Sequence, residues 1–109
     1  MTYLSSPYFH PFASIRQARF EKVCRIAGKL MRDGEHIYCP IAHSHSIQQL
    51  FDLPHDHEFW MRIDEEHLKR CDKLVVAMMD GWEESVGVAW EIKRARELGL
   101  PVEFMEVPA

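Results

Sequence analysis

The chain has 109 residues, 47% of them apolar and 28% charged, a composition that describes one soluble globular domain and excludes a disordered chain. The formal net charge of −4 gives no electrostatic reason to expect a nucleic-acid polymer or an anionic membrane as a partner. The three cysteines lack Cys-x-x-Cys spacing, and no apolar run or leader pattern indicates a membrane span or export. We therefore expect a single domain, residues 1–109, in the reducing cytoplasm.

Short β-prone runs alternate with longer segments of helical period along the chain. In chain order, we expect a strand at 2–6, a helix at 14–33, a strand at 36–42, a helix at 58–71, a strand at 73–79, a helix that starts near Ser85, and a strand at 101–107. Ser14 is the expected N-cap of the first helix, and Gly34 and Gly99 are expected to close the first and last helices. The histidine-rich segment 43–57 is expected to be a long loop with a short helical turn near 46–51.

This alternation predicts an α/β fold, a three-layer sandwich with a flavodoxin- or Rossmann-like parallel sheet of about four strands in the order 2-1-3-4. Ligands of such folds bind beyond the carboxyl ends of the strands. That rule selects the segments 5–9, 40–45 and 80–85, together with the end of the last strand. The helix that begins near Ser85 would direct unpaired N–H groups into the same crevice, where they favour an anion such as phosphate.

Two carboxylates occupy positions where helical period predicts a core residue. The first stripe is Val88, Glu91, Ala95 and Leu98, and its twin on the preceding helix is Met61, Asp64, Leu68 and Cys71. A single acid in such a stripe is commonly a boundary residue that reaches water. Two of them, on helices that flank one strand, favour function, because paired carboxylates can divide the attack on a sugar carbon and the transfer of a proton.

The segment "SVGVAWEIKRA", preceded by "IDEEHLKRCD" and the strand "KLVVAMM", resembles the nucleoside 2-deoxyribosyltransferase-like family. It is most similar to the branch of deoxynucleoside 5′-monophosphate N-glycosidases, and "DGWEES" also resembles an uncharacterised bacterial subfamily. The family motif Ser-x-Gly-x-x-x-Glu falls on Ser85, Gly87 and Glu91. The family also has an aspartate eight residues before the one that opens the third strand, and here these are Asp64 and Asp72. Its first strand carries an aromatic residue followed by small residues, which here are Tyr3, Ser5 and Ser6.

The resemblance implies a retaining mechanism in which Glu91 attacks the anomeric carbon and the base leaves. Asp64 would orient the nucleophile or protonate the base, and Tyr3 would contact the Glu91 carboxylate or the sugar. Transferases of the family that act on free nucleosides carry an aspartate at the position of Ser85. A hydroxyl at a helix N-terminus accepts a 5′-phosphate that an acid would repel, so Ser85 favours a nucleotide over a nucleoside.

The remaining candidates come from loops and turns. His43 follows the second strand and Trp82 precedes Ser85, so both are candidate ligand contacts beside Ser5, Ser6, Ser85 and Gly87. The pairs His43 with His45 and His55 with His57 suggest zinc, but the cysteines are not at ligand spacing. We therefore expect no metal and no cofactor.

Two functions remain open from the sequence. One is an enzyme that cleaves a nucleoside 5′-monophosphate, and the other is a non-catalytic nucleotide-binding or sensing protein on the same fold. The expected partner is a small nucleotide or nucleoside, with no nucleic-acid polymer and no membrane. The family resemblance and the modest core of so small a domain both favour a homodimer or higher homo-oligomer.

Overall fold

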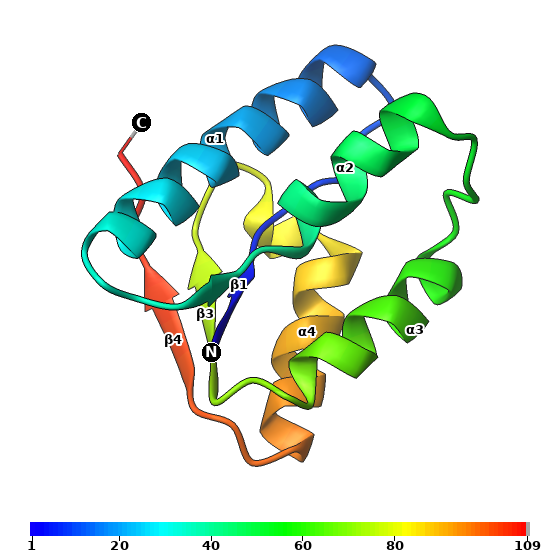
Figure 1. The fold of residues 1–109 in the computed structure, drawn as a ribbon. Helices are drawn as coiled ribbons and strands as arrows, with labels where there is room; N and C mark the ends of the chain where they lie inside the picture. Colours follow the sequence, from blue (N-terminus) through cyan, green and yellow to red (C-terminus); the bar gives the residue numbers. More distant parts are fainter. Residues whose placement is uncertain (109) are drawn as a thin grey trace.

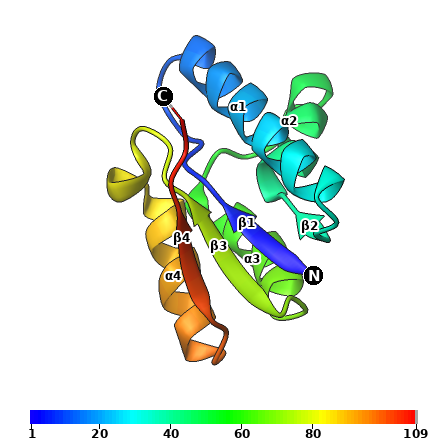
Figure 2. The same ribbon diagram turned by 90° about the vertical axis from the view of Figure 1, so that its left-hand side faces the viewer.

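The computed structural model describes residues 1–108, in which four parallel strands form one sheet. The strands are β1 (Thr2–Ser5), β2 (Ile37–Tyr38), β3 (Lys73–Ala77) and β4 (Val102–Met105), in the order β2-β1-β3-β4. The helices are α1 (Ala13–Arg32), α2 (Pro40–Leu50), α3 (His57–Leu68) and α4 (Val86–Glu97), and a 3-10 turn, η1, spans Trp82–Glu84. The predicted α/β fold class and strand order are confirmed (Figures 1 and 2).

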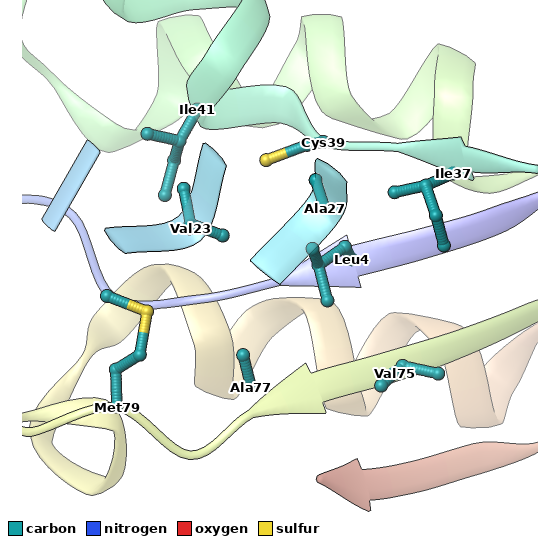
Figure 3. Packing of buried hydrophobic residues seen from close by; sticks show 9 residues of the cluster. All are labelled: Leu4, Val23, Ala27, Ile37, Cys39, Ile41, Val75, Ala77 and Met79. Atoms are coloured by element: carbon teal, nitrogen blue, oxygen red, sulfur yellow. The ribbon is translucent and has the colours of Figure 1, made fainter. Parts of the chain in front are cut away.

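Alternation along the strands sends neighbouring side chains to opposite faces of the sheet. On one face, Leu4 and Ala77 pack against Val23 and Ala27 of α1. Figure 3 shows this cluster between the strands and α1, with Ile41 at its α2 end. The other face buries a second cluster against α3 and α4: Tyr3, Leu68, Cys71, Leu74, Val76, Val88 and Ala95. Ser5 lies two residues after Tyr3, so it faces the α3–α4 side as well.

Two predictions between residues 36 and 57 are wrong. The strand β2 contains only Ile37 and Tyr38, and the expected loop is mostly the helix α2, which leaves residues 51–56 as the connection to α3. Pro40 does not simply end the strand, because it occupies the first turn of α2, where its missing N–H costs nothing. Ile41 and His45, four residues apart, are both buried and give the helix its inner face.

The start of α1 also differs from the prediction. Phe12, rather than Ser14, occupies the N-cap position, and its carbonyl accepts the N–H groups of Ile15 and Arg16. The predicted stops are correct, since Gly34 and Gly99 both take positive φ values, 97° and 76°, at the ends of α1 and α4. Within residues 1–108, no helix is both long and apolar enough to cross a membrane.

Candidate functional site

A cavity of about 430 Å³ lies at the carboxyl end of the sheet. The β1–α1 loop, α2, α3 and the first turns of α4 surround it (Figure 1). Its lining residues from the sequence predictions are Ser6, Asp64, Ser85, Gly87 and Glu91. The parallel topology explains this convergence, because it brings loops that are distant in sequence to one edge.

Glu91 is the centre of the polar contacts in the cavity. Glu91 is only 6% exposed, although its side chain is a carboxylic acid. The other buried residues of its helix, Val88 and Ala95, are apolar. The Tyr3 hydroxyl donates a hydrogen bond to Oε2 of Glu91, and the Ser5 hydroxyl donates to Oε1 at 2.7 Å. Both donors come from β1, so the first strand holds the carboxylate of the last helix by both oxygens. Such two-point contact fixes the orientation of Glu91.

The carboxyl groups of Glu91 and Asp64 have strongly shifted acidities. Burial, followed by the charge of Asp64, raises the pKa of Glu91 to about 8, although the Ser5 and Tyr3 hydrogen bonds lower it. Burial raises the pKa of Asp64 to about 7. The two groups interact, so the pair retains about one proton near neutral pH. Taken singly, these values leave that proton on Glu91. The ionised form of Glu91 is the one that accepts both hydroxyls, and in that state the shared proton lies on Asp64.

These raised pKa values predict a stability that falls as pH rises. Unfolded glutamate and aspartate lose their protons near their ordinary pKa values of 4.5 and 3.8, whereas the folded Glu91–Asp64 pair keeps about one proton up to near neutral pH. The native state therefore binds more protons between these values, and its free energy of unfolding decreases with pH across this window. We expect thermal unfolding to shift to lower temperature between pH 5.5 and 8.5, and to shift less in Glu91→Gln. If the unfolding temperatures of the wild type and Glu91→Gln fall equally with pH, the buried Glu91 carboxyl is not the cause of the fall.

The N-terminal end of α4, the helix that carries Glu91, offers hydrogen-bond donors to the cavity. The Ser85 Oγ accepts the N–H of Val88 at 3.2 Å, which makes it the N-cap of α4 and leaves its hydroxyl hydrogen available to a ligand. The N–H groups of Val86 and Gly87 precede the first intrahelical bond, which runs from Ala89 to Ser85.

Across from this helix end, the β1–α1 loop contributes a second donor. Within residues 1–108, the buried Ser6 Oγ, which lines the cavity, has no hydrogen-bond partner. Glu84 also lines the cavity and brings a negative charge close to Ser85. The donors of this region can hold an anion if Glu84 stays turned toward solvent.

Three of the predicted ligand contacts, Ser5, His43 and Trp82, are absent from the cavity lining, and Ser5 is fully buried and donates to Glu91 instead. His43 is exposed on α2, with its ring centroid 6.4 Å from that of Tyr38 and 6.1 Å from that of His67. The helix turns Ile41, Ser44 and Gln48 toward the cavity instead, so the unexpected α2 rotates His43 away. Trp82 packs against the second core cluster, which lies between the sheet and helices α3 and α4. Its ring centroid lies 5.7 Å from that of Phe104 on β4.

Sequence reasoning missed the aromatic walls. Trp60 and Trp90 line the cavity, together with Tyr8, Phe9 and His57. The Trp60 indole N–H donates to the Pro54 carbonyl at 2.8 Å, which ties the 51–56 connection to α3. A signal was present in the sequence, because Trp90 directly precedes Glu91 and Trp60 lies one helical turn before Asp64. Within residues 1–108, no three His, Cys, Asp or Glu side chains are grouped to hold a metal ion.

Comparisons with known proteins agree with this fold. A solved structure of the 2-deoxyribosyltransferase from the psychrotolerant bacterium Bacillus psychrosaccharolyticus has a similar fold, with a TM-score of 0.67 and 24% sequence identity. The match covers 96% of this chain and 71% of that one. No curated protein matches the sequence. A family model described as a domain of unknown function (DUF1937) matches residues 1–107. The chain therefore belongs to the DUF1937 family, and its fold is similar to that of a 2-deoxyribosyltransferase.

Proposed function

We propose that the protein cleaves the N-glycosidic bond of a nucleoside 5′-monophosphate, as an N-glycosidase or a (deoxy)ribosyltransferase. The observation that carries this proposal is the buried Glu91 carboxylate, held by Tyr3 and Ser5 and coupled to Asp64 in one cavity. A carboxylate held in place with a protonated partner is the arrangement that retaining glycoside cleavage needs. The fold shared with a 2-deoxyribosyltransferase supports the same chemistry.

In the first step, an ionised Glu91 oxygen bonds to the anomeric carbon while the bond from that carbon to the base nitrogen breaks. The base takes the bonding electrons together with the proton of Asp64 and departs neutral. In the second step, water or another base attacks the anomeric carbon, returns its proton to Asp64 and releases the Glu91 carboxylate. Tyr3 and Ser5 hold Glu91 in its attacking orientation and stabilise the carboxylate when it leaves again.

The cavity lining offers groups suited to both the phosphate and the base of such a nucleotide. The α4 N-terminus with Ser85, Gly87 and Ser6 would take the 5′-phosphate, since all of them offer donors without adding charge. Trp60 and Trp90 would stack on the flat base, because an indole ring can stack on any of the bases.

The test is incubation with a panel of ribo- and deoxynucleoside 5′-monophosphates, followed by chromatography for free base. Release of base from at least one of them is expected. Binding of a nucleotide without release would favour the alternative, a nucleotide-sensing protein that keeps the pocket without turnover. A protein that neither binds nor cleaves any of these nucleotides would overturn both the enzyme and the sensor proposals.

The proposed active form is a homodimer or higher homo-oligomer. Phe9 and Val86 line the cavity and are 65% and 66% exposed, so a single chain leaves apolar side chains at its mouth in water. Burial of such side chains in a symmetric contact would stabilise a domain of this size. Light scattering at micromolar concentration should give a mass of two chains or more, and a monomer would contradict the proposal.

A further inference from the structure

The structure separates the histidines of the pair His43 and His45, because it exposes the first and buries the second. The Nδ1 of His45 lies 2.7 Å from the hydroxyl of Tyr8 in the β1–α1 loop, and its Nε2 lies 2.9 Å from Oε1 of Gln17 on α1. The ring also stacks on Phe20 of α1, with the two centroids 4.2 Å apart. A buried imidazole with a partner at each nitrogen and a stacked face is fixed in position and rotation.

The direction of each hydrogen bond follows from the exposed end of this chain of contacts. The Gln17 Nε2 lies 3.0 Å from a carboxylate oxygen of Glu21, and a carboxylate only accepts, so the Gln17 amide points its nitrogen there. The Gln17 Oε1 then faces His45, and it also accepts a hydrogen bond from Nε2 of Gln49 at 3.0 Å. The His45 Nε2 must therefore carry a hydrogen, which leaves Nδ1 of the neutral ring as an acceptor. Tyr8 donates its hydroxyl hydrogen to this nitrogen.

The surroundings of His45 favour the neutral ring that this arrangement needs. Burial, followed by the positive charge of Arg16 on α1, lowers the pKa of His45 below its ordinary value. A neutral imidazole keeps one nitrogen free to accept, whereas a protonated one would donate from both. His45 can therefore hold the Tyr8 hydroxyl in one direction at neutral pH.

The partner of His45 belongs to the wall of the cavity. Tyr8 lines the cavity together with Ser6 and Phe9 of the same loop, whereas His45 lies behind Tyr8 and outside the lining. We propose that His45 is a positioning residue for the ligand: it accepts the Tyr8 hydroxyl and so fixes the Tyr8 ring as a wall against which a nucleotide packs. A side chain that is already restrained loses less conformational freedom when the ligand binds. The identity of the ligand rests on the proposed function.

A cycle of two variants separates this role from simple packing. His45→Phe keeps a ring that can stack on Phe20 but removes the acceptor, and it should weaken nucleotide binding about three- to tenfold. Tyr8→Phe removes the donor and should weaken binding by a similar factor. When both changes are combined, the second should cost no more, because His45 acts through Tyr8. Calorimetry with the nucleoside 5′-monophosphate that binds the wild type most tightly measures all four proteins.

Two further variants complete this series. His45→Asn places a side-chain oxygen near the position of Nδ1, so it should still accept the Tyr8 hydroxyl and retain more of the affinity than His45→Phe does. Ser46→Ala, at the exposed neighbour of His45 on α2, is the control and should bind the nucleotide as the wild type does.

Nitrogen-15 NMR tests the hydrogen-bond directions in the ligand-free protein, and it depends on neither nucleotide binding nor turnover. The His45 ring signals, assigned by their loss in His45→Asn, should show a protonated Nε2 and an unprotonated Nδ1 at neutral pH. The Nδ1 signal should shift in Tyr8→Phe, where its donor is missing. A protonated Nδ1 in the wild type would overturn the proposal, since Tyr8 could not then donate to it.

The binding cycle can also overturn the positioning role. If His45→Phe weakens binding equally in the wild-type and Tyr8→Phe backgrounds, His45 only packs. If nucleotides bind with the expected coupling between His45 and Tyr8 but none is cleaved, the proposed reaction fails and the positioning role of His45 stands.

Discussion

Glu91→Gln is expected to abolish base release, lowering turnover of the best nucleotide by about 1000-fold or more. An amide oxygen does not attack the anomeric carbon and would not leave it again. The Gln side chain has nearly the same volume and can keep hydrogen bonds with Tyr3 and Ser5, so the fold should be retained. Chromatographic assay of free base checks the rate, and circular dichroism checks the fold.

A matched control is Glu83→Gln, at an exposed glutamate of η1 that does not line the cavity, which should retain wild-type turnover. Unchanged base release in Glu91→Gln would rule out the nucleophilic role. Loss of the folded state in Glu91→Gln, with Glu83→Gln folded, would favour a structural role for the buried acid.

Ser85→Asp is expected to reverse the preference of the protein for a nucleotide over its nucleoside. In the wild type, charge-assisted hydrogen bonds to a 5′-phosphate, each worth roughly 1.5 to 3 kcal/mol, should favour the nucleotide about tenfold or more. Aspartate is also a good N-cap and can accept the Val88 N–H, so α4 should remain intact. Its charge, added to that of Glu84, repels the phosphate and leaves the nucleoside unaffected.

Calorimetry with matched nucleotide and nucleoside pairs decides this prediction. Ser85→Ala is the control, since it removes the hydroxyl without adding a charge and should weaken the nucleotide preference without reversing it. Equal affinity of the wild type for both ligands would leave Ser85 as a helix cap and nothing more.

The sheet and the carboxylate pair were predictable from the sequence because both rest on strong periodicities. The apolar run 73–79 required a central strand, and strict helical spacing placed Glu91 among Val88 and Ala95, where the structure buries it. The Tyr3 contact with Glu91 was expected from the family resemblance, whereas Ser5, expected to contact the ligand, donates to Glu91 because residues two apart on a strand point to the same face.

The predictions failed where tertiary contacts overrode weak local signals. The strand expected over 36–42 includes Pro40, although proline is also favoured in the first turn of a helix, where Pro40 lies. Polar residues of α2 concealed its inner face, whose buried members are Ile41 and His45. That error misplaced His43, because a loop residue near the strand end became a helical residue that faces away from the cavity.

The stereochemistry of transfer to methanol tests the nucleophilic role of Glu91 most directly. A base-releasing reaction run in dilute methanol gives a methyl glycoside whose anomers proton NMR distinguishes. Two displacements at the anomeric carbon, the first by Glu91 and the second by methanol, predict a product with only the β configuration of the substrate. A product with the α configuration, or a mixture of the two anomers, would contradict a covalent role for Glu91.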